Sequence, residues 1–201
     1  MRNSVGVGIG GGVRGGCILR PAPRDWLVAA SADVRYDERT YAGEESLGLH
    51  AAREDGLIAT YELRSSDGLR IRRLTFFYQE TSGSTGGGLR FFDENDQDLL
   101  GVATDNPQHL IDDANGFSEG SYGTEYDIWV KVDVIFDWAA ETADVRFTPQ
   151  LEDGSPSRYP DRPLKTGRPV AMVQLWDQHL KEWKNYEIEM WVDAVEIALP
   201  R

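Results

Sequence analysis

Residues 129–138 read Trp-Val-Lys-Val-Asp-Val-Ile-Phe-Asp-Trp, and this stretch decides the fold class. Its even-numbered positions are all apolar, whereas Lys131, Asp133 and Asp137 fall on the odd positions. Successive side chains of a β-strand point to opposite faces, so the alternation predicts a strand with one buried and one exposed face. Such a strand forms one layer of a sandwich.

Short runs of the same kind follow one another along most of the chain, separated by clusters of Gly, Asp, Asn and Ser. This spacing, without an amphipathic helical stretch, is typical of an antiparallel all-β sandwich. The expected strands are Ser46–His50, Leu57–Leu63, Leu69–Tyr78, Gly88–Phe92, Leu99–Thr104, Ile128–Asp137, Ala143–Phe147, Val170–Trp176 and Tyr186–Leu199.

The length of 201 residues suits one domain, which we expect to span residues 25–201. Residues 1–24 begin with a glycine-rich stretch that predicts a flexible leader, and no continuous apolar segment marks a clear signal peptide or a membrane span. Cys17 is the only cysteine, which excludes an intrachain disulfide.

The chain carries a net charge of -13, and its only lysines are Lys131, Lys165, Lys181 and Lys184. Excess negative charge repels phosphate backbones and anionic headgroups, which disfavours nucleic acid and membrane insertion. Molar salt screens charges beyond about 3 Å, so a carboxylate-rich surface is tolerated there. The composition favours a halophilic protein; an ordinary acidic secreted domain is the alternative.

Two polar segments and one change of pattern stand out. Residues 93–98 predict an exposed hairpin loop whose oxygens could hold calcium, with a solvated turn as the alternative. Asp105–Glu125 lacks regular alternation and is expected to be a long loop, either for recognition or as a solvated insertion. The apolar parity changes between Asp193 and Val195, which predicts a β-bulge.

Catalytic constellations find little support in the sequence. His50, His109 and His179 are the only histidines; no Gly-x-Ser-x-Gly motif occurs, and no zinc-ligand spacing appears. Glu187 and Glu189 would lie about 6.5–7 Å apart on one strand face, within the carboxylate separation of glycoside hydrolases. We therefore expect a protein that is not an enzyme, with a glycan hydrolase or lyase as an alternative.

Sugar binding needs flat aromatic side chains beside polar groups that bond hydroxyls, and the chain supplies both. Partial burial in the core is the alternative for each tryptophan. The candidate ligand-binding residues are Trp129, Trp176, Asp177, Trp183, Trp191, Glu187 and Glu189.

Four motifs together resemble the concanavalin A-like lectin/glucanase jelly rolls, including laminin-G-like modules, of haloarchaeal type. They are residues 43–49 (Gly-Glu-Glu-Ser-Leu-Gly-Leu), 87–93 (Gly-Gly-Leu-Arg-Phe-Phe-Asp), 129–137, and 190–197 (Met-Trp-Val-Asp-Ala-Val-Glu-Ile). The resemblance implies two facing antiparallel sheets, a ligand on a sheet face or loop edge, and often a structural calcium ion. By that analogy Asp193 and Glu45 are the candidate metal ligands.

These observations favour a non-catalytic carbohydrate-binding or adhesion module, displayed extracellularly, at the cell surface or on a virus particle in high salt. Its expected partner is a glycan or surface polysaccharide. The alternative is a structural or assembly protein of a virion or cell surface that binds a protein partner.

Overall fold

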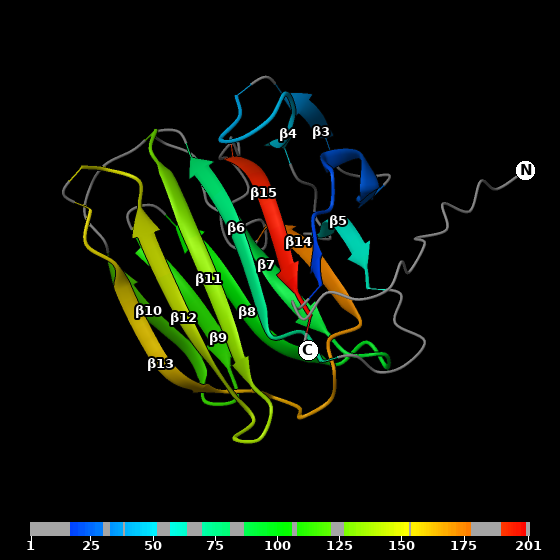
Figure 1. Ribbon diagram of the computed structural model, residues 1–201, viewed down its shortest axis with the longest axis vertical. Helices are drawn as coiled ribbons and strands as arrows, with labels where there is room; N and C mark the ends of the chain where they lie inside the picture. The colour runs from blue at the N-terminus through cyan, green and yellow to red at the C-terminus, as the bar shows by residue number, and fades with distance from the viewer. Residues whose placement is uncertain are drawn as a thin grey trace, which may run out of the picture.

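The computed structural model describes residues 17–29, 33–37, 39–51, 57–63, 70–80, 87–105, 108–121, 127–152, 154–177 and 190–199. In this part of the chain, antiparallel strands form an eight-stranded and a seven-stranded sheet (Figure 1). The eight-stranded sheet contains β13 (Ser157–Pro163), β12 (Thr142–Pro149), β11 (Trp129–Asp137), β6 (Arg73–Glu80), β15 (Met190–Ala198), β4 (Ser46–Ala51) and β3 (Asp33–Asp37) in that order, with β1 (Ile18–Leu19) on β15.

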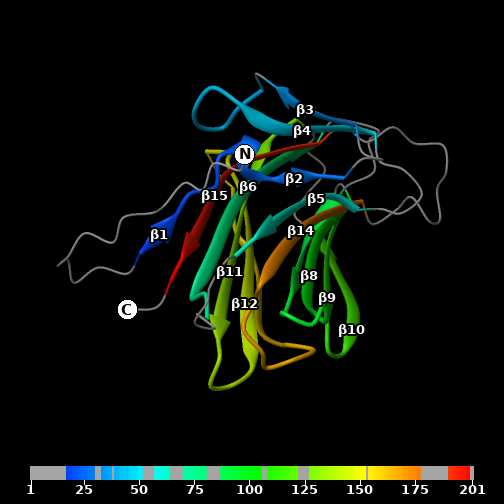
Figure 2. The same ribbon diagram turned by 90° about the vertical axis from the view of Figure 1, so that its right-hand side faces the viewer.

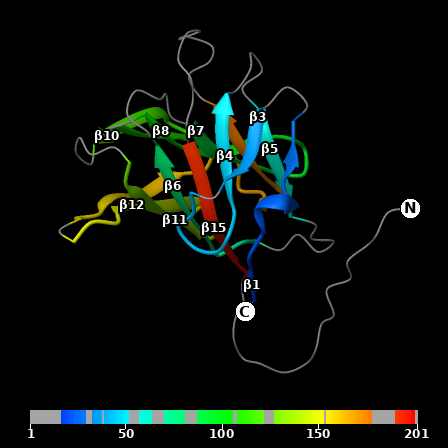
Figure 3. The same ribbon diagram turned by 90° about the horizontal axis from the view of Figure 1, so that it is seen from above.

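The seven-stranded sheet lies against the first one as a second layer. Its order is β10 (Gly116–Ser121), β9 (Gln108–Asp113), β8 (Asp98–Asp105), β7 (Gly87–Phe92), β14 (Met172–Asp177), β5 (Leu57–Glu62) and β2 (Leu27–Val28). Figure 2 shows β6, β11 and β12 in one layer and β8, β9 and β10 in the other, and Figure 3 shows the layers from above. The predicted all-β sandwich is confirmed.

The core lies between the sheets and is built from the inward positions of each strand. Val130, Val132 and Val134 of β11 are essentially fully buried, while Lys131 on the other parity is only partly buried. Phe136 then meets Phe91 of β7 edge to face across the layers, with ring centroids 5.5 Å apart. Each such side chain contributes about 1.5–3 kcal/mol by leaving water, so the alternation selects this packing.

The hairpin β9–β10 corrects the expectation of a long loop at residues 105–125, of which residues 106–107 and 122–126 lie outside the described part. Asp113 and Gly116 pair directly, and Gly116 has a φ of 91°. Pairing continues to Gln108 and Ser121. The alternation is hidden in the sequence because His109 and Asp113 occupy inward positions, where they bond to the other layer.

The predicted bulge at the end of the chain is present in β15. The register with β6 shifts between Asp193 and Glu196, and Ala194 has a φ of 48°. Because of the extra residue, Val195 and Ile197 point into the core, as Met190 and Val192 do before the bulge. The bulge therefore keeps both halves of β15 packed although their sequence parities differ.

The beginning of the described chain contributes to the sandwich. Ile18 and Leu19, within the segment expected to be a flexible leader, pair with Ala198 and Ile197 of β15. Residues 17–24 therefore belong to the folded body, whereas residues 1–16 lie outside the described part. No helix among the described residues is long and apolar enough to cross a membrane.

Candidate functional site on the seven-stranded sheet

A row of polar side chains crosses the outer face of the seven-stranded sheet. Asp112 of β9 is registered with Gly101 of β8, and Gly101 with Arg90 of β7. Arg90 is in turn registered with Gln174 of β14, and Gln174 with Thr60 of β5. Their chain neighbours, such as Leu89, Val102 and Leu175, are buried in the core. The row therefore faces away from the core.

The middle of this face is built from small residues. Gly101 lies between Asp112 and Arg90, and a Cβ placed on Gly101 would lie 3.2 Å from the Asp112 Cβ and 3.8 Å from the Arg90 Cγ. The neighbouring row continues with Ala103 and Gly88, which are paired. Small residues in a strand commonly mark a place where another molecule approaches the backbone. These small residues form a floor that is itself buried, because the Asp112 and Arg90 side chains pack over Gly101 and Ala103 packs against Gly88.

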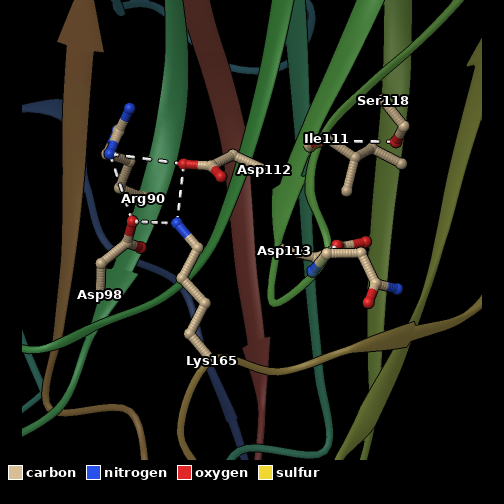
Figure 4. Close-up of polar contacts among 8 residues, drawn as sticks. Arg90, Asp98, Ile111, Asp112, Asp113, Ser118 and Lys165 are labelled. Carbon is tan, nitrogen blue, oxygen red and sulfur yellow. Dashed lines mark hydrogen bonds and ion pairs between the residues drawn. The ribbon is translucent and has the colours of Figure 1, made fainter.

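Four charged side chains, which we call the charged quartet, stand beside this floor (Figure 4). Lys165 Nζ lies 2.8 Å from one oxygen of Asp98 and 2.8 Å from one oxygen of Asp112. Arg90 approaches the same two oxygens at 3.2 Å and 3.7 Å. Alternating charges in one ring hold all four side chains in fixed positions.

Lys165 is placed by its backbone, whose N–H donates to the carbonyl of Leu99 at 2.9 Å. Burial by itself lowers the pKa of Lys165. Its hydrogen bonds to Asp112 and Asp98, together with the negative charges of both, outweigh this effect, so the pKa of Lys165 is raised overall. The lysine is therefore a permanent cation in this site.

Trp176 supplies a flat apolar surface at the other side of the floor. Its Nε1 donates to Gln174 Oε1 at 2.8 Å, and the Arg90 guanidinium lies 5.6 Å from its ring centroid. The Phe92 ring lies 6.5 Å away. These contacts fix the indole next to the charged quartet, so that one ligand could touch both.

Asp98 offers an acceptor that the described residues leave unused. Its Oδ2 contacts Lys165 and Arg90, whereas its Oδ1 is buried and accepts no hydrogen bond from a described group. A buried polar atom without a partner is costly, and a ligand hydroxyl is a suitable donor.

Inter-layer contacts hold β9 in place at this end of the sandwich. Arg162 of β13 donates to Asp113 at 2.6 Å and to Ser118 at 2.8 Å. His109 is fully buried, stacks on Phe147 at 4.2 Å and bonds to the hydroxyl of Tyr159. Burial lowers the pKa of His109 to about 4, so it is neutral at physiological pH.

The structure divides the sequence-predicted ligand residues between the two layers. Trp176 and the backbone of Asp177 belong to the seven-stranded sheet, at the candidate site. Trp129 and Trp191 lie on the outer face of the eight-stranded sheet, both registered with Gln79 of β6. Trp183, Glu187 and Glu189 lie outside the described residues, so their role stays a prediction.

The two predicted metal ligands have other partners. Asp193 Oδ2 accepts from the backbone N–H groups of Tyr41 and Ala42 at 2.7 and 2.8 Å, and its Oδ1 accepts from Ala194 at 2.5 Å. Both oxygens of Glu45 bond to Arg24, at 2.5 and 2.8 Å. Both carboxylates line an open cavity of about 610 Å³. As placed, their oxygens hold donors and do not fit a shared calcium ion.

Other acidic groups in the described part of the chain do not supply a metal centre either, because no three of its His, Cys, Asp and Glu side chains are grouped to hold an ion. In the hairpin at residues 93–98, Asp93 is buried and its Oδ1 accepts from the N–H groups of Asn95 and Gln97, at 2.8 and 3.0 Å. This arrangement is a solvated turn closed by its first aspartate.

Most residues of the candidate site were not singled out from the sequence. Arg90 and Gln174 alternate with apolar residues in two predicted strands, so the sequence predicts that their side chains point away from the core. The sequence does not show that β7 and β14 are neighbours, because strand order is a property of the whole sheet. It also does not show that Lys165 approaches this face from a connecting segment. Trp176 and its neighbour Asp177 are the residues of this site that were singled out from the sequence as candidates.

No family model matches the chain, and no curated protein does. Solved structures do match. Lectin I from Ulex europaeus, in complex with the methyl glycoside of α-L-fucose, has a TM-score of 0.57 and 11% identity, covering 91% of this chain and 97% of the lectin.

Two similar structures have enzyme names. The GH131 β-glucanase catalytic domain from Podospora anserina matches with a TM-score of 0.53 and 9% identity over 86% of this chain and 84% of the domain. A sialidase matches with a TM-score of 0.56 and 12% identity over 86% of this chain, which spans only 16% of that protein. At these identities the similarity shows the fold alone: this chain is a concanavalin A-like jelly roll.

Proposed function

We propose that this protein is a non-catalytic glycan-binding module that holds a saccharide on the outer face of the seven-stranded sheet. The observation that carries the proposal is the row Asp112–Gly101–Arg90–Gln174 with Trp176 beside it. A sugar ring has apolar faces and a rim of hydroxyls, and here an indole adjoins fixed donors and acceptors.

The comparisons support the proposal at the level of the fold, which lectins and a glucanase share with this chain. The net charge of -13 supports a setting in high salt, and we propose that the protein is displayed there outside the cell or on a virus particle. An adhesion role at such a surface follows from the same reasoning, with a surface polysaccharide as the partner.

Calorimetric titration with a panel of neutral and acidic oligosaccharides in high salt tests the proposal. We expect Trp176→Ala to weaken binding about tenfold or more, because it removes the stacking surface. Trp176→Phe is the matched control; it keeps an aromatic face, loses the bond to Gln174, and should weaken binding only about threefold. Wild-type protein that binds no saccharide but forms a stable complex with a protein would favour the assembly alternative.

A glycan hydrolase is the second candidate, favoured by the two carboxylates of the charged quartet. Asp98 and Asp112 each lie 2.8 Å from Lys165 Nζ, which limits their separation to less than about 6 Å, near the spacing of retaining glycosidases. However, Lys165 lies between them and would have to leave before a substrate could enter. We expect no release of reducing sugar; turnover that Asp98→Asn and Asp112→Asn both abolish would instead establish the hydrolase.

A further inference from the structure

The outer face of the eight-stranded sheet carries a second group of aromatic and polar side chains, on the layer opposite the candidate site. Trp129 of β11 and Trp191 of β15 are both registered with Gln79 of β6, which stands between them. Neighbouring strands lie about 4.8 Å apart, so the two tryptophans are anchored roughly 10 Å from each other.

Gln79 is the polar centre of this group and is incompletely bonded. Its side chain is 7% exposed, and its Nε2 donates to the carbonyl of Asp127 at 2.6 Å. Its Oε1 is buried and accepts no hydrogen bond from a described residue. Native proteins seldom leave a buried amide oxygen in that state, which suggests a donor that arrives with a ligand.

Arg39 lies beside this centre, over the Trp191 ring. Its guanidinium is 4.2 Å from the Trp191 ring centroid, and its NH1 donates to Asp127 Oδ1 at 3.2 Å. Arg39 thus extends from β15 to the residue whose carbonyl binds Gln79. Asp127 has a φ of 59°, a backbone conformation that non-glycine residues seldom adopt outside turns and functional sites.

Tyr41 forms an apolar wall beside the centre. Its ring stacks on Phe77 at 3.7 Å and meets Trp129 edge-on at 5.8 Å, yet 41% of Tyr41 remains exposed. The backbone of Tyr41 is fixed by Asp193 at 2.7 Å, and its hydroxyl donates to Gln150 at 3.3 Å. The exposed ring of Tyr41 and the partly buried ring of Trp129 therefore border the buried amide.

We propose that these residues form a second saccharide site, independent of the one on the seven-stranded sheet. The Arg39 guanidinium moves aside, a sugar hydroxyl donates to Gln79 Oε1, and the apolar face of the ring packs on Trp129 and Tyr41. Because the free acceptor and the aromatic walls suit a hydroxylated ring, the site takes a neutral saccharide.

The test follows the indole N–H signals of each tryptophan by NMR while cellohexaose, laminarihexaose or maltohexaose is added in high salt. The titration uses Trp176→Ala, in which the first site is disabled. We expect the Trp129 and Trp191 signals to move in that variant. Adding Arg39→Ala should strengthen binding severalfold, because it removes the side chain that would otherwise have to move aside for the sugar.

Gln79→Met should lower the affinity about tenfold, whereas the same substitution at Gln97, an exposed residue of the hairpin at 93–98 outside both sites, should leave it unchanged. Tyr41→Ala, at an exposed side chain, provides a second test if Gln79→Met does not fold. If the Trp129 and Trp191 signals do not move, the second site is overturned. If the indole signal of Trp176 does not move in the wild type, that result counts separately against the first site. If the Trp129 and Trp191 signals move with N-acetyl-arginine amide but with no saccharide, the second saccharide site would also be overturned, because the ligand would then be a cation.

Discussion

At the scale of single residues, the contact between His109 and Tyr159 shows how a polar pair can replace apolar packing between two sheets. Gly120 makes the contact possible, because a Cβ there would lie only 1.6 Å from the Tyr159 hydroxyl. The neutral imidazole stacks on Phe147 and bonds to Tyr159. His109 therefore belongs to the core, although histidine suggests an exposed or catalytic position.

The low pKa of His109, about 4, makes this contact sensitive to acid. The unfolded chain takes up the proton near pH 6.5 and the folded one only near pH 4, so stability falls as the pH falls between these values. We expect the wild type to lose roughly 2–3 kcal/mol over this window relative to His109→Gln. Urea unfolding of both proteins at several pH values measures the difference; parallel curves would contradict a buried neutral histidine.

At the scale of elements, strands were predictable where their inward positions are apolar. β11 was predicted to within a residue because Val130, Val132 and Val134 alternate with polar side chains. β9, β10 and β13 were missed because His109, Asp113 and Arg162 make their inter-layer contacts with polar groups. A pattern of hydrophobicity cannot show such strands, since the partner that satisfies each polar group is distant in the sequence.

The candidate site was less predictable than the fold for a related reason. Trp176 is visible in the sequence as an aromatic residue near the end of a strand. Arg90 lies next to Trp176 only because β7 pairs with β14. These two strands are far apart in the sequence. Cross-strand register is set by the whole sandwich, so a site assembled across strands is revealed only by the structure.

The bulge in β15 allows Asp193 to fasten the segment that carries Tyr41 and Ala42. Asp193→Ala would leave both N–H groups without their charged acceptor, and we expect it to destabilise the fold by about 1.5–3 kcal/mol. Asp193→Asn keeps one acceptor oxygen and should cost less. Chemical unfolding measures both variants, and an alanine variant as stable as the wild type would show that the fastening is unimportant.

Because the oxygens of Asp193 and Glu45 already accept from N–H donors, we expect the segments that they join to be stable without calcium. We expect the melting temperature to change by less than about 2 °C when EDTA is added or calcium is supplied, which corresponds to well under 1 kcal/mol. Differential scanning calorimetry provides the comparison, with magnesium as a control for ionic strength. A rise specific to calcium would restore these carboxylates as metal ligands.

At the scale of the whole molecule, the charge of -13 sets the dependence on salt. Repulsion among exposed carboxylates weakens as the Debye length falls from about 10 Å at 0.1 M to about 3 Å at 1 M. We expect the melting temperature to rise by roughly 5–10 °C between low and molar potassium chloride. A melting temperature that does not change would remove the argument for a halophilic setting.

The two sheets give the molecule two outer faces, and the charged quartet with Trp176 distinguishes the face of the seven-stranded sheet. A crystal structure of the protein with a bound oligosaccharide tests this assignment most directly. We predict sugar density beside the charged quartet, with the ring on Trp176 and hydroxyls bonded to Arg90, Gln174 or Asp98. A saccharide bound tightly elsewhere, with this face in contact only with solvent, would contradict the account.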